Sequence, residues 1–582
     1  MANDNLLQIK DLCVEFSTKE GPVKALKNIS FNIPKGKTVG LVGESGSGKS
    51  VTSLATMGLI PNPPGRVTNG EILFDGVDLL KMTDEQMRKI RGNKISMIFQ
   101  EPMTSLNPVF TVGFQIAEVL RLHQGMSKSQ ARTRTLELLT QVGIPTPDQK
   151  IDAYPHELSG GQKQRIMIAM AIGCEPDLLI CDEPTTALDV TIQKQVIELM
   201  MDLQKKYGMS MLFITHDLGV IADIADDVVV MYRGDIVEQN TTEEIFTKPK
   251  HPYTKGLLAC RPPLEKHPHR LVTVSDFMDE DGKEKSPPEV KYDNPVRPFT
   301  ESENPVILEV NNLKKHFPIR GGIFGRVRDH FKAVDDISFK VRKGRTLGLV
   351  GESGCGKTTL GRSLLRLIEP TEGEILWKGE DLVHADANKM RALRRDLQII
   401  FQDPYASLNP RMTIGAAIME PMEIHGLYGG KEERKKKASE LLEKCGLPGS
   451  VLTRYPHEFS GGQRQRVCIA RALAVDPEFI ICDESVSALD VSIQAQILNL
   501  LLDLQEDLDL TYIFISHDLA VVKFISDEVM VMNKGKMVEM ADAEQIYNQP
   551  KEEYTKRLLS AIPKGVPKTL LEKGITAADL QF

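Results

Sequence analysis

The chain of 582 residues is long enough for about four domains of ~150 residues, and its 41% hydrophobic and 26% charged residues are typical of a globular protein. Its net charge of −8 argues against a nucleic-acid binder with a broad basic face. No apolar run approaches the ~18 residues of a membrane span. The segment MANDNLLQIKDL lacks a signal-peptide pattern, and the eight scattered cysteines form no CxxC pair, so we expect a reducing compartment.

The first motif along the chain is LVGESGSGKS (41–50), which returns as LVGESGCGKT (349–358). Each copy follows an apolar, β-rich run and precedes a helical pattern, the context of the phosphate-binding loop GxxxxGK[ST]. We expect Lys49 and Lys357 to reach the β- and γ-phosphates and Ser50 and Thr358 to hold Mg²⁺. The loop residues expected to wrap the phosphates are Gly43, Ser45, Gly46, Gly48, Gly351, Ser353, Gly354 and Gly356.

Two further motifs are duplicated in the same order. MIFQEPMTSLNP (97–108) matches IIFQDPYASLNP (399–410), which places Gln100 and Gln402 at equivalent points. LSGGQKQR (158–165) matches FSGGQRQR (459–466). Small residues that open a helix expose backbone N–H groups and suit close approach to an anion. The candidate anion-binding residues of these loops are Ser159, Gly160, Gly161, Gln162, Ser460, Gly461, Gly462 and Gln463.

Adjacent carboxylates end two short apolar runs, LLICDE (178–183) and FIICDE (479–484). A buried parallel strand delivers such acids to the carboxyl edge of its sheet. We expect Asp182 and Asp483 to bind Mg²⁺ through water, and the catalytic Glu183 and Glu484 to orient and deprotonate the water that attacks the γ-phosphate. The next apolar strand in each half ends at His216 or His517, which we interpret as γ-phosphate contacts.

The duplication predicts two copies of one domain, over 1–247 and 305–545. Each copy carries a C-terminal extension, at 248–264 and 546–582. The segment 265–304 between them is acidic and Pro-rich with few apolar residues, so we expect a flexible linker that buries no core.

With these motifs in place, each half resembles an ABC-type ATP-binding domain. The resemblance implies an α/β fold: two tandem P-loop NTPase domains, each a RecA-like mixed sheet with a helical signature subdomain, in a head-to-tail pair. It also implies ATP and Mg²⁺ as cofactors, and Ser-Gly-Gly-Gln loops that close over the ATP of the opposing domain. By the same resemblance, Gln100 and Gln402 sense Mg²⁺ and nucleotide, and Asp189 and Asp490 link the two sites. Phe16 and Phe317 either stack on adenine or pack in the core.

The SLNP after each glutamine loop and the tails KPKHPYTKGLLACRPP (248–263) and EEYTKRLLSAIP (552–563) are similar to those of oligopeptide, dipeptide and nickel importer ATPases. Two such subunits are fused here, as in some peptide and glutathione importers. The resemblance implies two integral-membrane permease subunits and an extracytoplasmic solute-binding protein as partners, and no nucleic acid. It places the chain peripherally on the cytoplasmic face of the inner membrane, with membrane contact only through partners.

Some members of that family hold an iron–sulfur cluster in this tail through several cysteines. Only Cys260 is present here, so we expect no cluster. His251, His267 and His269 match no standard zinc spacing and are interpreted as solvated tail residues.

Two alternative functions remain to be weighed. A tandem ATPase that acts on the ribosome would need a long basic helical linker, whereas this linker is acidic and Pro-rich. A DNA-repair ATPase would need a long insertion between the phosphate and signature loops, for which Lys49 and Ser159 lie too close in sequence. The sequence does not identify the solute, because its specificity lies in other chains.

Overall fold

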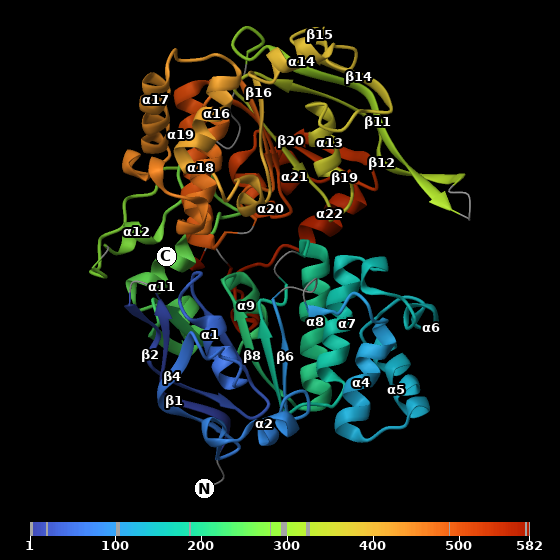
Figure 1. Cartoon of the computed structure of the whole chain (residues 1–582), viewed down its shortest axis with the longest axis vertical. Coiled ribbons are helices and arrows are strands. Elements are labelled where there is room, and N and C mark those ends of the chain that lie inside the picture. The colour runs from blue at the N-terminus through green and yellow to red at the C-terminus, as the bar shows by residue number, and fades with distance from the viewer. Residues whose placement is uncertain are drawn as a thin grey trace.

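The computed structural model describes residues 4–18, 21–100, 105–185, 188–279, 281–292, 300–321, 326–487, 489–576 and 579–580. The chain forms two halves of the same α/β architecture, and the second half lies above the first in Figure 1. Each half contains a six-stranded mixed sheet, a four-stranded antiparallel sheet and a helical subdomain. The predicted duplication and fold class are therefore confirmed.

The six-stranded sheets have the same strand order, β10-β9-β3-β8-β7-β6 in the first half and β20-β19-β13-β18-β17-β16 in the second. Among the described strands of these sheets, only the β9–β10 and β19–β20 pairs are antiparallel. The central strands are continuous apolar runs because both faces of a parallel sheet are covered. The strands are β3 (Thr38–Val42), β6 (Ile95–Ile98), β7 (Leu178–Asp182), β8 (Ser210–Thr215), β9 (Asp227–Tyr232), β10 (Asp235–Thr241), β13 (Thr346–Val350), β16 (Leu397–Ile400), β17 (Phe479–Asp483), β18 (Thr511–Ile515), β19 (Glu528–Asn533) and β20 (Lys536–Asp542).

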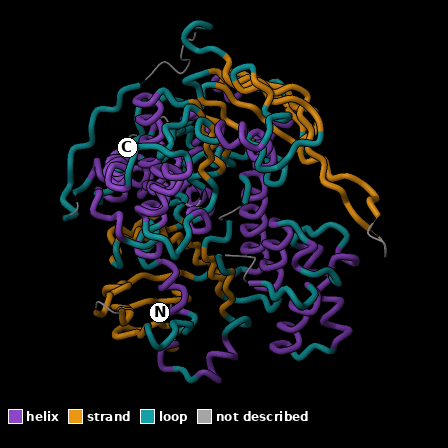
Figure 2. The backbone as a smooth tube through the Cα atoms, turned by 45° about the horizontal axis from the view of Figure 1, so that its top comes forward, coloured by secondary structure: helices purple, strands orange, loops and turns teal. Residues whose placement is uncertain are grey.

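The antiparallel sheets have the orders β2-β1-β4-β5 and β12-β11-β14-β15. Their strands are β1 (Asn5–Thr18), β2 (Gly21–Pro34), β4 (Gly65–Phe74), β5 (Val77–Asp78), β11 (Val306–Gly321), β12 (Arg326–Arg342), β14 (Glu372–Trp377) and β15 (Glu380–Asp381). The hairpin of β11 and β12 is longer than its counterpart, because the second half has extra residues at this turn. Figures 1 and 2 show it projecting from the body of the protein.

Helices flank the sheets and carry the loops of the site. In the helical subdomains, α7 and α18 begin at the Ser-Gly-Gly motifs because Ser159 and Ser460 cap them, each accepting a hydrogen bond from the backbone N–H three residues on. The helices around the sheets are α1 (Lys49–Thr56), α2 (Asp84–Ile90), α8 (Val190–Tyr207), α9 (Leu218–Ile224), α10 (Thr242–Thr247), α13 (Lys357–Leu364), α14 (Ala387–Leu393), α19 (Val491–Leu508), α20 (Leu519–Ile525) and α21 (Ala543–Asn548). Those of the subdomains are α4 (Val112–Gln124), α5 (Lys128–Gln141), α6 (Pro147–Lys150), α7 (Gly160–Ile172), α15 (Pro404–Ser407), α16 (Ile414–Ile424), α17 (Lys431–Lys444) and α18 (Gly461–Leu473).

The two C-terminal extensions cross between the halves. Their helices are α11 (Pro252–Ala259), α12 (Val274–Phe277), α22 (Glu553–Ser560) and α23 (Lys568–Glu572). Lys523 of the second half donates a hydrogen bond to the Leu264 carbonyl at 2.6 Å. In the opposite direction, Lys194 of the first half donates to the Ser560 carbonyl at 3.1 Å, and Lys573 pairs with Glu243 at 2.7 Å. Each extension is thus bonded to the other half.

The expectation that the 265–304 linker buries no core is wrong for its first part. Leu271, Val274, Phe277 and Met278 are buried. They are most of the apolar residues in the first part of the segment, and two of them, Val274 and Phe277, begin and end the short helix α12. The backbone N–H and carbonyl of Leu271 both bond to the Asn499 side chain of α19, at 2.9 and 2.8 Å. Residues 280 and 293–299 of the linker lie outside the described residues.

Candidate functional site

Both phosphate loops adopt the expected strand–loop–helix geometry, between β3 and α1 and between β13 and α13. Gly43 has a φ of 150°, and a Cβ atom there would lie 2.2 Å from the Met231 carbonyl oxygen, so only glycine fits. Lys49 Nζ turns back onto its own loop and donates to the carbonyls of Gly43 and Glu44, at 2.7 and 3.0 Å. Lys357 makes the same pair of contacts in the second half.

A hydroxyl group and a carboxylate, both suitable oxygen ligands for Mg²⁺, lie together at each phosphate loop. The Ser50 hydroxyl donates to Asp182 Oδ1 at 3.1 Å, and the Thr358 hydroxyl donates to Asp483 Oδ1 at 2.9 Å. Burial raises the pKa of both carboxyls and lowers the pKa of Lys49. Buried charges of both signs beside a glycine loop fit the phosphates and Mg²⁺ of a nucleotide, because hydroxyl and carboxylate oxygens are preferred Mg²⁺ ligands.

The candidate catalytic glutamates occupy an unusual backbone conformation. Glu183 and Glu484 both have a φ of 49°, in the left-handed region that non-glycine residues rarely adopt. A backbone hydrogen bond of 2.9 Å from each glutamate N–H to the neighbouring strand, at Ile214 or Ile515, fixes this turn directly after the buried aspartate. Strain of this kind is concentrated at functional positions, where the surrounding structure enforces it.

Each glutamate lies between the predicted glutamine and histidine of its own half. Gln100 Nε2 donates to Glu183 Oε2 at 3.0 Å, and His216 Nδ1 lies 3.3 Å from Glu183 Oε1. Although burial disfavours the imidazolium, the hydrogen bond and charge of Glu183 outweigh it and raise the pKa of His216.

The second half has the same arrangement. Gln402 Nε2 donates to Glu484 Oε2 at 2.7 Å, and His517 Nδ1 lies 3.5 Å from the same oxygen. Burial of Glu484 would raise its pKa, but His517 and Lys357 lower it overall. Three side chains that sequence reasoning selected separately therefore converge in each half.

Two contacts join each phosphate loop to the opposite half. Asp490 of the second half accepts a hydrogen bond from the Ser45 backbone N–H at 2.9 Å. Asp189 of the first half accepts one from the Ser353 N–H at 3.2 Å. The two aspartates thus lie at the loops of the opposing half, as a head-to-tail pair requires.

The Ser-Gly-Gly-Gln loops are engaged locally. The Ser159 and Gln162 side chains bond reciprocally to each other's backbone N–H, and Ser460 and Gln463 do the same. In the described part of the chain, neither serine side chain bonds to the opposing phosphate loop. Phe16 is half-buried next to Gly65, and Phe317 lies on the long hairpin with 37% of its surface exposed.

Sequence reasoning missed a tyrosine in each C-terminal extension. Tyr253 of α11 and Tyr554 of α22 accept hydrogen bonds from the backbone N–H groups of Glu44 and Glu352, at 2.9 and 3.2 Å. Both glutamates are the second residues of the phosphate loops. Burial raises the pKa of Tyr554 to about 12, so the phenol is neutral at physiological pH. The duplicated Tyr-Thr-Lys of the two tails was the available sequence signal.

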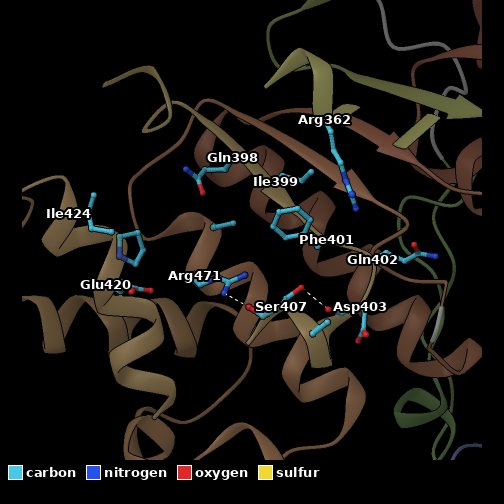
Figure 3. A pocket seen from close by; sticks show the side chains of 13 residues that line it. Arg362, Gln398, Ile399, Phe401, Gln402, Asp403, Ser407, Glu420, Ile424 and Arg471 are labelled. Carbon is cyan, nitrogen blue, oxygen red and sulfur yellow. Dashed lines mark hydrogen bonds between the residues drawn. The ribbon is translucent and has the colours of Figure 1, made fainter. Parts of the chain in front are cut away.

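A groove of ≈ 670 Å³ opens beside the second glutamine loop (Figure 3). Its walls include Arg362 of α13, Phe401 and Gln402 at the end of β16, and Glu420 and Arg471 of the helical subdomain. Arg471 donates to the Ser407 carbonyl at 2.5 Å, which connects two of these walls. The groove therefore lies between the sheet core and the helical subdomain and includes the loop that bonds to Glu484.

Within the described ranges, no helix combines the length and apolar character needed to cross a bilayer. No cluster of three or more histidine, cysteine or acidic side chains suited to a metal ion occurs in the same ranges. Cys260 is buried at the end of α11, and His251 caps that helix by accepting from the Tyr253 N–H at 3.1 Å. His251 is thus a structural cap rather than the solvated tail residue that we expected.

Comparison with known proteins gives two family matches, each found twice. The family model for the ABC transporter matches residues 26–186 and 334–487. The model for the oligopeptide/dipeptide transporter C-terminal region matches residues 237–280 and 538–578. The first of these tail matches extends past residue 264 into the folded part of the linker.

Curated relatives match almost the whole chain. The glutathione import ATP-binding protein GsiA of Salmonella typhimurium is 50% identical over 97% of this chain and 90% of its own length. The protein of the same name from Escherichia coli (strain K12) is 49% identical over the same shares. A solved dimeric bacterial ABC transporter cassette, MJ0796, is 28% identical and covers 40% of this chain and 98% of that cassette, with a TM-score of 0.37.

Proposed function

Because the chain belongs to the ABC transporter family and carries two of its ATPase domains, we propose that it energises an importer of peptides or peptide-like solutes, glutathione among them. The observation that carries this proposal is the pair of extensions that match the oligopeptide/dipeptide transporter C-terminal region. Similarity to glutathione import proteins over 97% of the chain supports the same class of solute.

We infer that ATP binds at two composite sites, each made of one phosphate loop and the opposing Ser-Gly-Gly-Gln loop. Lys49 would then act with Ser460, and Lys357 with Ser159. The hydrogen bonds from Ser45 to Asp490 and from Ser353 to Asp189 support this assignment, because they place each loop against the opposite half. Backbone N–H groups at a helix start favour an anion at that position.

The chemistry proposed for each site is attack of water on the γ-phosphate. Bound Mg²⁺ would neutralise phosphate charge, with Ser50 and Asp182 as its protein donors in the first half and Thr358 and Asp483 in the second. Glu183 and Glu484 would accept the proton of the attacking water. The contacts from Gln100 and His216 to Glu183 support this role, because they orient its carboxylate at the edge of the sheet.

The proposed partners are two integral-membrane permeases and an extracytoplasmic solute-binding protein, which would hold the chain on the cytoplasmic face of the membrane. The groove beside Gln402 supports a coupling between a permease and the second ATP site. Gln402 lines this groove and also donates a hydrogen bond to Glu484, the proposed general base. A permease segment in this groove would shift the glutamine loop and so bias ATP hydrolysis.

The experiment is a transport assay in cells that lack the gene. Uptake of labelled glutathione, a dipeptide and a longer oligopeptide is measured after complementation with the wild type or with the Glu183→Gln, Glu484→Gln double variant. We expect the wild type alone to restore uptake of at least one of these solutes. Unchanged uptake of all three solutes in the deleted strain would reject the peptide-type assignment. Absence of ATPase activity from the purified wild type would reject the family function itself.

A further inference from the structure

The two aspartates proposed to bind Mg²⁺ have different neighbours. In the first half, both carboxylate oxygens of Asp182 accept hydroxyl hydrogen bonds, Oδ1 from Ser50 at 3.1 Å and Oδ2 from Ser53 at 3.4 Å. In the second half, Asp483 Oδ1 accepts from Thr358, but Oδ2 is buried and has no hydrogen-bond partner among the described residues. The guanidinium of Arg362 lies 3.7 Å from that oxygen, an ion-pair distance rather than a hydrogen bond.

This difference comes from two adjacent positions on the helices that follow the phosphate loops. Ser53 and Leu54 of α1 correspond to Gly361 and Arg362 of α13. A Cβ atom at Gly361 would lie 3.0 Å from the Ile515 side chain, so the second half has no room for a hydroxyl without movement of its core. The second half therefore replaces a neutral donor with a positive charge, one residue further along the helix.

Arg362 also reaches the groove beside the glutamine loop. Its guanidinium lies 6.0 Å from the centroid of the Phe401 ring, and both residues line the groove with Gln402 (Figure 3). The Arg362 Nε is buried without a hydrogen-bond partner among the described residues. The Arg362 side chain is thus attracted to the Asp483 carboxylate and the Phe401 ring, but it donates no hydrogen bond to that carboxylate. Of this side chain, 39% is exposed.

We propose that Arg362 is a positioning residue that makes the two sites unequal: it holds the Asp483 carboxylate by charge and weakens Mg²⁺ binding at the second site. A cation beside a metal-binding carboxylate would oppose the metal, and the repulsion between a unit charge and a divalent ion bound to the same carboxylate is on the order of tenfold in affinity at a water-like dielectric. Leu54 exerts no such effect at the first site. An occupant of the groove that draws Arg362 away from Asp483 would strengthen Mg²⁺ binding at the second site alone.

The inference rests on the proposed nucleotide sites, so its test uses chains with one intact site. Lys49→Ala leaves the second site and Lys357→Ala leaves the first, both in the Glu183→Gln, Glu484→Gln background that prevents turnover. Each protein is loaded with ATP and titrated with Mn²⁺, and the free ion is quantified by electron paramagnetic resonance. We expect half-saturation of the second site at a Mn²⁺ concentration about three to ten times that of the first.

Variants at the equivalent positions Leu54 and Arg362 then test whether the arginine charge causes the difference in Mn²⁺ half-saturation. In the Lys49→Ala protein, Arg362→Leu should lower the Mn²⁺ concentration at half-saturation by about three- to tenfold, whereas Arg362→Lys, which keeps the charge, should leave it near that of the parent. In the Lys357→Ala protein, Leu54→Arg should raise the Mn²⁺ concentration at half-saturation of the first site. Thermal unfolding of each variant confirms that the fold is retained.

The outcomes separate this inference from the function on which it rests. Equal Mn²⁺ half-saturation before and after Arg362→Leu, in a protein that still binds ATP, would overturn the role of Arg362 only. A decrease on Arg362→Lys as large as that on Arg362→Leu would show that charge is not the cause, and would overturn the same role. Failure of the Lys49→Ala protein to bind ATP at all would overturn the second nucleotide site and the inference together.

Discussion

The Tyr253 hydroxyl accepts a hydrogen bond from the backbone N–H of Glu44 at 2.9 Å, across 209 residues of sequence. The tyrosine is fully buried in the C-terminal extension, whereas Glu44 belongs to the phosphate loop. Burial raises the pKa of the Glu44 carboxyl, and Ser492 of the second half opposes that shift. The extension thus fixes the loop of its own half at the point where the opposite half meets it.

Tyr253→Phe should therefore weaken nucleotide binding. The Glu44 N–H would lose its acceptor at a partly buried position, which costs about 1 kcal/mol or more. We expect ATP affinity to fall about three- to tenfold and the melting temperature to decrease, as measured by ligand titration and thermal unfolding. Tyr207→Phe is the control, since its hydroxyl bonds to Gln141 in the helical region. Equal ATP affinity in the two variants would contradict the role of Tyr253.

Glu183→Gln combined with Glu484→Gln should abolish turnover while ATP binding is retained. In the proposed mechanism the carboxylates act on the attacking water, whereas the lysines and loop N–H groups hold the nucleotide. Loss of a general base typically costs about 10²–10⁴-fold in rate. Phosphate release and equilibrium ATP binding are measured on the same preparation. Hydrolysis at the wild-type rate would show that neither glutamate is the base.

The motifs that depend on local sequence were predictable. A glycine loop between an apolar strand and a helix predicted both phosphate loops, and each pair of acids predicted a strand end at the carboxyl edge of its own sheet. The contact of Tyr253 with Glu44 and that of Leu271 with Asn499 join segments that are far apart in the chain, and no local pattern encodes such pairing. The positive φ of Glu183 and Glu484 could not be predicted from the sequence either, because the neighbouring strand imposes it.

Asn499→Leu should release the first part of the linker from α19. The substitution leaves the buried N–H and carbonyl of Leu271 without partners, and each costs about 1–3 kcal/mol. We expect a lower melting temperature and faster proteolysis between residues 265 and 292. Asp503→Ala is the matched control on the same helix, since its ion pair with Arg270 is about half exposed and contributes less than about 1 kcal/mol. Identical cleavage of both variants would show that this contact does not hold the linker.

Paired lesions test whether the two ATP sites are composite. If Lys49 acts with Ser460, then Lys49→Ala and Ser460→Arg damage the same site and leave the other intact. If Lys357 acts with Ser159, then Lys49→Ala with Ser159→Arg damages both sites. Two substitutions in the same site should have strongly non-additive effects on ATP trapping, whereas the effects of substitutions in separate sites should add.

The measurement is the amount of ATP trapped per chain in the Glu183→Gln, Glu484→Gln background. Under the proposed assignment, loss of the lysine charge or obstruction of the Ser-Gly-Gly-Gln N–H groups should each prevent closure of a site, since both groups would stabilise the bound phosphates electrostatically. We therefore expect about one trapped ATP per chain for the Lys49/Ser460 pair and about none for the Lys49/Ser159 pair. The reverse pattern would mean that each half completes its own site. The hydrogen bond from Ser45 to Asp490 argues for the first pattern, because it already joins the first phosphate loop to the second half.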